Sequence, residues 1–149
     1  MADLSAVDLT VRSAVYARFG AGDVPSASGI AADLGMDVDA VIECYERLAT
    51  AHVLVLDPDS REVWMAMPFS AVPTAFRVDG LGRQWFANCA WDAFGIAVAL
   101  SCDVSIATYC LDCGTPTAYG VRDGALTTRD GVVHFAVPAK QWWDDIGFT

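Results

Sequence analysis

A cysteine and an aspartate stand three residues apart in the stretch WFANCAWDAF, residues 85–94, which is otherwise mostly apolar and aromatic. Burying a carboxylate without a partner is costly, so an apolar segment that keeps Cys89 and Asp92 calls for a chemical explanation. A thiolate is a soft nucleophile and metal ligand, and a carboxyl group can carry a proton. Together they suit a reaction in which sulfur binds a soft centre and a proton is delivered beside it.

The spacing of the pair decides whether both groups can act on the same atom. Positions i and i+3 of a helix lie on one face, so Cys89 and Asp92 address the same small volume if the segment is helical. In the first turns of a helix the N-terminal dipole favours the thiolate of Cys89. Desolvation among Trp91, Phe94 and Trp85 favours the neutral form of Asp92. The alternative is that Cys89 is a small core residue and Asp92 a hydrogen-bonded helix residue.

The first half of the sequence predicts three helices followed by a β-hairpin. Apolar residues recur at helical spacing in three segments, which are residues 4–19, 26–34 and 38–53. A serine can cap the second helix, and Asp37 can cap the third. Residues 54–67 then alternate like a hairpin with a central turn. This order of elements is the outline of a winged helix.

The second half of the sequence predicts a small β-sheet with one embedded helix. Residues 68–84 contain two prolines and two glycines and are interpreted as a linker. Helical spacing returns over 85–100, and alternation predicts strands within 103–111, 119–127 and 132–138. The fold class is therefore α+β. We expect a winged-helix-like module of three helices over residues 1–75 and a small mixed β-sheet domain with an embedded helix over residues 76–149.

Charge and hydropathy exclude several classes of partner. Aspartate and glutamate total 19 against 9 lysines and arginines, which gives a net charge of −10. The third predicted helix is itself acidic, with four carboxylates against one arginine over residues 37–50. This balance repels nucleic-acid backbones and anionic lipid. The longest apolar run, residues 93–102, is too short to span a bilayer, and the N-terminus lacks a signal-peptide pattern. We expect a cytoplasmic protein without nucleic-acid or membrane partners.

A second group of cysteines follows the predicted helix. Cys110 and Cys113 have the Cys-x-x-Cys spacing of metal knuckles and redox dithiols. A structural zinc needs about two more ligands, for which Cys102, His52 and His134 are available. Zinc binding, a dithiol redox role, and plain packing with incidental binding of a soft metal all stay open.

The remaining candidate residues are interpreted as structural. His134 lies between Val133 and Phe135 in a predicted strand, so we expect its side chain on the opposite face of the strand from theirs. We interpret it as a structural histidine whose ring nitrogens are hydrogen-bonded. Trp142 and Trp143 are expected to pack in the core. The five cysteines are expected to be mainly reduced in the cytoplasm, and their odd number fits thiol chemistry better than a disulfide framework.

Three segments together resemble the organomercurial (alkylmercury) lyase family, namely GRQWFANCAWDAFGIAVAL, VSIATYCLDCGTP and VVHFAVPAKQWWDDIGFT. The resemblance covers residues 76–149 well and the N-terminal module more loosely. It implies that Cys89 is the nucleophile, that Asp92 is the proton carrier and that Cys110 is structural. Mercury prefers thiolate, and cleavage of a carbon–mercury bond needs a proton at the departing carbon. The implied chemistry therefore matches that of the pair.

The resemblance also implies a substrate and partners. The expected reaction is protonolysis of a carbon–mercury bond, which yields a hydrocarbon and Hg(II). Mercury would bind Cys89 and Asp92 as substrate and product, with no resident cofactor. The expected partners are a small organomercurial substrate, and low-molecular-weight thiols or a mercury reductase as acceptors of Hg(II). External thiols would release the product.

The sequence departs from the family pattern at its end. The family carries a second catalytic cysteine directly after a stretch like DDIGFT, whereas this sequence ends at Thr149, and none of the other four cysteines lies at the matching position. We therefore expect a truncated chain, a natural product without the activity, or a stop-like codon that encodes selenocysteine. Two further functions stay open: a non-catalytic thiol protein that binds mercury or another soft metal, and an acidic winged-helix regulatory module.

Overall fold

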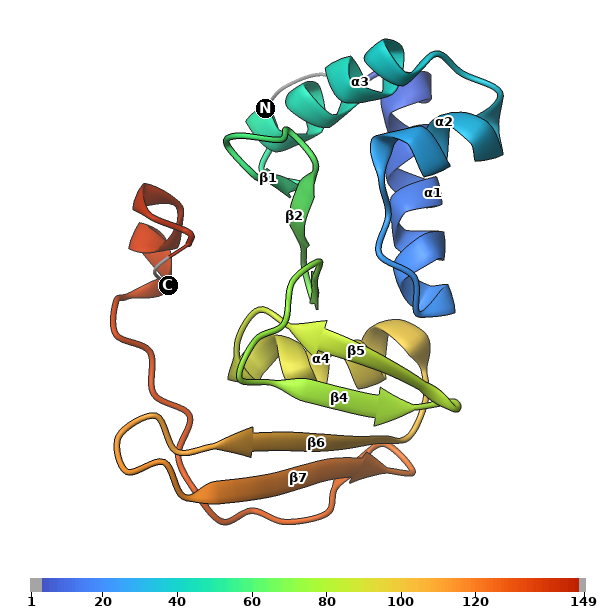
Figure 1. Cartoon of the computed structure of the whole chain (residues 1–149). Coiled ribbons are helices and arrows are strands. Elements are labelled where there is room, and N and C mark those ends of the chain that lie inside the picture. The colour runs from blue at the N-terminus through green and yellow to red at the C-terminus, as the bar shows by residue number, and fades with distance from the viewer. Residues whose placement is uncertain (1–3, 148–149) are drawn as a thin grey trace.

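The computed structural model describes residues 4–147, in which three helices precede a β-sheet that carries a fourth helix (Figure 1). The N-terminal helices are α1 (Ala6–Ala21), α2 (Ala27–Leu34) and α3 (Val38–Thr50). They pack against one another and bury a shared apolar core, which includes Val11, Val15, Ile30, Val41, Tyr45 and Leu48. The three predicted helices are thus present, close to their expected bounds.

Capping residues explain where these helices begin and end. Ser5 accepts a hydrogen bond from the backbone N–H of Asp8, whose carboxylate accepts one from the backbone N–H of Ser5, and this capping box starts α1. Ser26 caps α2 and Asp37 caps α3, as the sequence predicts. Gly35 ends α2 in the left-handed region, which glycine adopts without strain.

A buried ion pair joins α1 to α3. The guanidinium Nε of Arg47 lies 2.9 Å from Oδ1 of Asp8, whose side chain is almost fully buried. Burial raises the pKa of Asp8, but hydrogen bonds from Ser5 and Arg47 outweigh it and hold the pKa at about 2. Arg47 is the only cation of α3, so its engagement with Asp8 leaves the exposed surface of that helix acidic.

An eight-stranded sheet follows, in the order β1-β2-β3-β5-β4-β6-β7-β8. Its strands are β1 (Val55–Leu56), β2 (Val63–Ala66), β3 (Phe69–Ser70), β4 (Arg77–Gly80), β5 (Arg83–Ala87), β6 (Val104–Tyr109), β7 (Pro116–Arg122) and β8 (Ala125–Leu126). The embedded helix α4 (Ala90–Leu100) contacts β4, β5 and β7. The α+β class and the order of helices, sheet and embedded helix are confirmed. We expected a mixed sheet, but every strand pair among the described residues is antiparallel. Tight hairpins connect most neighbouring strands, and a hairpin joins antiparallel strands.

The centre of the sheet lies in residues 68–84, where the sequence predicts a linker. Strands β4 and β5 form a hairpin whose turn residues, Leu81 and Gly82, have φ angles of 51° and 70°. Two-residue turns with positive φ match the twist of the strands they join. Gly80 also permits a close approach of β4 to β6, since a Cβ there would lie 2.8 Å from the Asp103 carbonyl oxygen. The glycines therefore mark a tight hairpin and not a linker.

The helix predicted over 85–100 begins five residues later than expected, because residues 83–87 form β5. Trp85 and Ala87 point into the core, whereas Gln84 is exposed, which is the alternation of a strand. Trp85 lies opposite Val78 of β4, and both are buried. The two residues between β5 and α4 are Asn88 and Cys89.

The chain after β8 leaves the sheet. Residues 132–138, expected to form a strand, have no regular structure, and a 3₁₀ helix, η1 (Ala139–Asp144), follows them. His134 is exposed in this segment, so it is not the buried structural histidine expected from alternation. Figure 1 shows η1 apart from the layer formed by β6 and β7.

Trp142 and Trp143 pack near the surface and lie outside the main core in which they were expected. Trp143 stacks on His52, with ring centroids 4.1 Å apart. Trp142 lies against Phe135, and its indole N–H donates to the Val137 carbonyl at 3.1 Å. These contacts tie η1 to the end of α3 and to the segment that precedes η1.

Aromatic contacts pack the helical module on the sheet. Phe19 of α1 stacks on Phe69 of β3, with ring centroids 5.2 Å apart. The buried indole N–H of Trp85 donates to the Phe19 carbonyl at 2.6 Å. The sheet also crosses the boundary at residues 75 and 76, since β3 pairs with β5; the division into two domains stays a prediction. None of the helices in the described part of the chain is long and apolar enough to cross a membrane.

Candidate active site

Cys89 lies where the chain leaves β5 and enters α4. Its backbone is extended, and its sulfur caps the helix by accepting a hydrogen bond from the Asp92 N–H, with an N–S distance of 3.5 Å. Sulfur is a weaker acceptor than the oxygens that usually occupy this position. The structure thus brings the predicted pair together, with Cys89 directly before the helix and Asp92 in its first turn.

Asn88 holds Asp92 in place. Its Nδ2 donates to Oδ2 of Asp92 at 3.1 Å and to the Phe69 carbonyl at 3.2 Å. Its Oδ1 is buried and accepts no hydrogen bond from the described residues. Asn88 therefore fixes the carboxylate relative to β3 as well as to Cys89. It is absent from the residues predicted for the site, although an amide beside Cys89 in an apolar stretch is a signal for such a role.

Burial sets the protonation states of the pair. It raises the pKa of Asp92, and hydrogen bonds from Asn88 and Cys89 offset this only in part. Burial also raises the pKa of the Cys89 thiol; backbone N–H groups lower it, and the charge of Asp92 raises it further. The raised pKa of Asp92 agrees with expectation. The thiolate of Cys89 is therefore not favoured, contrary to expectation, because desolvation and the charge of Asp92 outweigh the backbone N–H groups at the start of the helix.

The helical module forms one wall of the site. Tyr16 of α1 is half-buried and donates its hydroxyl to the Met67 carbonyl at 3.1 Å. Burial raises the pKa of Tyr16, and the negative charge of Asp92 adds to that increase. On α4, Gly95 lies against Pro68, where an added Cβ would be 3.2 Å from the proline Cβ. Pro68, in the turn before β3, therefore packs against α4, and Tyr16 of α1 binds the backbone of the same turn.

The aromatic residues expected around Asp92 lie partly elsewhere. Trp91 is 67% exposed. Trp85 is buried, but its N–H is engaged with Phe19. Phe94 meets the ring of Tyr119 edge-on, with centroids 6.1 Å apart. Exposed Trp91 therefore does not cover Asp92, and the hydrogen-bond partner of its carboxylate is Asn88.

An apolar pocket of about 620 Å³ adjoins the start of α4. Its wall on α4 consists of Ala90, Ala93 and Phe94, and Ala90 directly follows Cys89. The strands and the segment after β8 supply the other walls, which include Phe76, Ile106, Thr117, Tyr119, Leu126, Val132 and His134. Neither Cys89 nor Asp92 lines this pocket, which could hold an apolar group against the Ala90, Ala93 and Phe94 side of α4.

The other four cysteines lie on other elements. Cys44 is buried in α3, with its sulfur 3.1 Å from the Arg47 guanidinium, and Cys102 is half-buried after α4. Cys110 and Cys113 are exposed between β6 and β7, and a structural role for Cys110 stays a prediction. Within residues 4–147 no three His, Cys, Asp or Glu side chains form a group that could hold a metal ion. The histidines and Cys102 thus do not complete a zinc site there.

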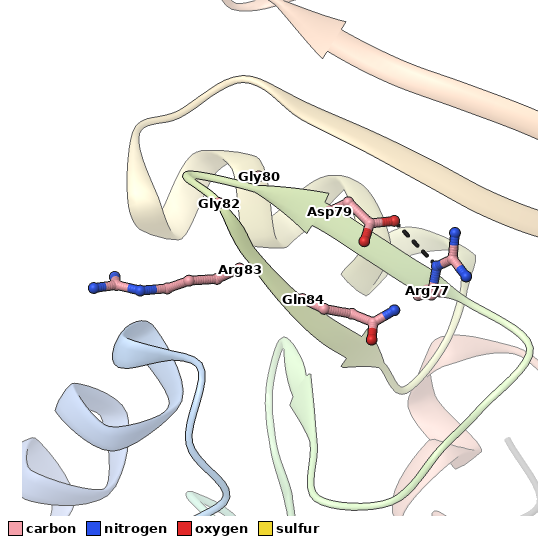
Figure 2. A pocket seen from close by; sticks show the side chains of 6 residues that line it. All are labelled: Arg77, Asp79, Gly80, Gly82, Arg83 and Gln84. Carbon is pink, nitrogen blue, oxygen red and sulfur yellow. Dashed lines mark hydrogen bonds and ion pairs between the residues drawn. The ribbon is translucent and has the colours of Figure 1, made fainter.

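A second hollow lies on the β4–β5 hairpin (Figure 2), where it is lined by Arg77, Asp79, Gly80, Gly82, Arg83 and Gln84. Arg77 and Asp79 form an ion pair with an N–O distance of 3.1 Å. Figure 2 shows Arg83 pointing away from this pair, and its guanidinium donates to the Gly20 carbonyl at 3.0 Å. No nucleophile lines this hollow, so the candidate active site is the Cys89–Asp92 pair.

Comparisons with known proteins bear on the same region. The family model for alkylmercury lyase, MerB, matches residues 69–149, which contain Cys89 and Asp92. The chain is similar to a crystal structure of the mercury-bound form of MerB2, with 25% sequence identity and a TM-score of 0.68. The similarity covers 85% of this chain and 61% of the MerB2 chain, so this chain spans about three fifths of that protein's length. No curated protein matches the sequence.

Proposed function

The chain belongs to the alkylmercury lyase family, and from that membership we propose that it cleaves carbon–mercury bonds through Cys89 and Asp92. The observation that carries this proposal is the half-buried pair at the start of α4, where the Asp92 N–H donates to the Cys89 sulfur at 3.5 Å and burial raises the pKa of both side chains. Such a pair can exchange one proton between sulfur and oxygen. It therefore combines a soft ligand for mercury with a proton source for carbon.

The first step is transfer of mercury to sulfur. As the Cys89 sulfur bonds to the mercury of R–Hg–X, its proton moves to Asp92 and the ligand X departs. The raised pKa of Asp92 suits this carboxylate to take the proton. Asn88 keeps the carboxylate oriented while it does so, because its amide is anchored on the Phe69 carbonyl.

The second step is cleavage of the carbon–mercury bond. Asp92 gives its proton to the carbon bound to mercury, the electron pair of the bond stays with that carbon, and the hydrocarbon RH departs. Mercury remains on Cys89 as Hg(II), and a second thiolate completes its coordination. That thiolate comes from a small thiol or from the cysteine that the family pattern places after Thr149, a position outside the described residues.

The apolar pocket is our proposed binding site for the organic group, because its lining residue Ala90 directly follows Cys89 in the chain. Its wall begins at Ala90, and Phe94, Phe76 and Ile106 offer apolar contact to an alkyl or aryl group. Burying such a group is worth about 25 cal/mol per Å² of apolar surface. We therefore propose small apolar organomercurials as substrates. The absence of a resident cofactor, the transfer of Hg(II) to small thiols or a mercury reductase, and a cytoplasmic location stay predictions.

Product release tests the proposal directly. The chain is incubated with methyl- or phenylmercury and excess monothiol, and methane or benzene is measured by gas chromatography. We expect release that is lost in Cys89→Ser. Tight binding to Cys89 without release would instead support the non-catalytic mercury-binding protein, and release that persists in Cys89→Ser would contradict the assigned nucleophile.

A further inference from the structure

A tight turn between β6 and β7 presents two thiols. The backbone N–H of Cys110 donates to the Thr115 carbonyl at 2.9 Å, and the Gly114 N–H donates back to the Cys110 carbonyl at 2.8 Å. Gly114 has a φ of 71°, a conformation that favours glycine. The sequence Cys-x-x-Cys-Gly therefore folds back on itself, which fixes the backbone on both sides of the cysteine pair.

The two sulfurs of this turn are free and lie near each other. Cys110 and Cys113 are both exposed, and neither belongs to the apolar core. The Cys113 sulfur lies 3.1 Å from the Thr115 hydroxyl oxygen, and its side chain also interacts with that of Cys110. Exposed thiols contribute little to packing, so the pair is available to a ligand.

We propose that Cys110 and Cys113 form a second mercury site, which holds one Hg(II) ion between two thiolates and is separate from Cys89. Soft metal ions select thiolate ligands. Hg(II) is stable with two thiolates in a linear arrangement, whereas a structural zinc site needs four ligands. No third ligand completes a metal-binding group anywhere in residues 4–147. A site with two thiols and no more fits Hg(II) and not zinc.

The location of the Cys110–Cys113 pair suits it to accept the Hg(II) that is released from Cys89. Cys110 lines the same apolar pocket as Ala90, the residue after Cys89. Hg(II) that leaves Cys89 as a complex with two small thiols can exchange both of them for Cys110 and Cys113, and two small thiols are released with no oxidation or reduction. This use as an acceptor rests on the proposed function, whereas the binding site itself does not.

The test uses Hg(II) without any carbon–mercury bond, in a chain that lacks Cys89. Serine is a preferred N-cap residue, so Cys89→Ser keeps the start of α4 intact. Hg(II) is supplied as its complex with two equivalents of glutathione, and unbound complex is removed by gel filtration. Mercury per chain is measured by native mass spectrometry, and free thiols are counted with a chromogenic disulfide.

We expect Cys89→Ser to retain one Hg(II) per chain and to lose two free thiols. Adding Cys110→Ser or Cys113→Ser should abolish this binding, whereas adding Cys102→Ser, the matched control, should leave it unchanged. The proposal is overturned if Cys89→Ser retains no mercury, if the ion persists without Cys110 or Cys113, or if the ion joins two chains. Because no organomercurial is present, failure here is distinct from failure of the lyase assay.

Discussion

Replacing Asp92 by asparagine should slow turnover and, at the same time, make the Cys89 thiol easier to ionise. Turnover should fall, because a neutral amide cannot deliver a proton to carbon. The loss of general acid catalysis is typically about 10²–10⁴-fold, or roughly 3–5 kcal/mol of barrier. The Cys89 thiol should meanwhile become more acidic, because the charge of Asp92 and its hydrogen bond with Cys89 both raise the pKa of that thiol.

Two rates measured on the same protein separate these effects. Benzene release from phenylmercury with excess monothiol reports turnover. Alkylation of Cys89 by iodoacetamide at neutral pH, followed by peptide mass spectrometry, reports the thiolate fraction. Both are measured on residues 1–149 and on a chain extended past Thr149 with the expected cysteine. Asp79→Asn is the matched control, since that carboxylate is paired with Arg77 outside the site.

The expected result for Asp92→Asn is slower release with faster alkylation, and Asp79→Asn should change neither rate. Unchanged release in the asparagine variant would refute the role of Asp92 as proton carrier. Unchanged or slower alkylation would refute the electrostatic argument for Cys89, because the negative charge beside the thiol would then have no effect on its ionisation.

Three further predictions concern neighbouring groups. Cys89→Ser should abolish hydrocarbon release from phenylmercury yet leave the thermal unfolding temperature equal or higher, because oxygen caps a helix better than sulfur. Asn88→Ala should raise the pKa of Asp92 further, since the lost hydrogen bond lowers it; carboxyl NMR titration measures the shift. The pKa of Asp8 is lowered to about 2 in the folded protein, so its carboxylate stabilises the fold at pH values above the pKa it has in the unfolded chain. This stabilisation is lost as the pH falls through 2. Asp8→Asn should therefore lower stability at neutral pH and flatten acid unfolding followed by circular dichroism.

The N-terminal helices could be predicted because their signals are local. Ser26 and Asp37 satisfy backbone N–H groups within three residues, and apolar side chains repeat along one face of each helix. These features depend little on the rest of the chain. The bounds of the helices therefore follow closely from the sequence.

The β4–β5 hairpin and the segment 132–138 were mispredicted because strands depend on distant partners. Val78 and Trp85 become strand residues by pairing with each other and by burial against the module. Residues 132–138 alternate equally well but find no neighbouring strand in the described structure. Alternation alone cannot distinguish these two situations.

The reactive pair of the site could be predicted, but its surroundings could not. The i, i+3 spacing of Cys89 and Asp92 was sufficient to place them together. The anchoring of Asn88 on Phe69 and the approach of Tyr16 depend on tertiary contacts from residues far away in sequence. The pKa of the Cys89 thiol also depends on how deeply the side chain is buried, which the sequence does not show. Burial raises this pKa by more than the helix N-terminus lowers it.

The pairing of β3 with β5 determines how the chain can be divided. Phe69 pairs with Ala87, and Ser70 with Phe86. A fragment that starts at residue 76 would leave the edge of β5 that faces β3 unpaired, although β4 would still pair with its other edge. The Trp85 indole N–H would also lose its acceptor, the Phe19 carbonyl. Open strand edges recruit further strands, so such a fragment is expected to self-associate and precipitate. A recombinant fragment of the second half is better started before Phe69 than after β3.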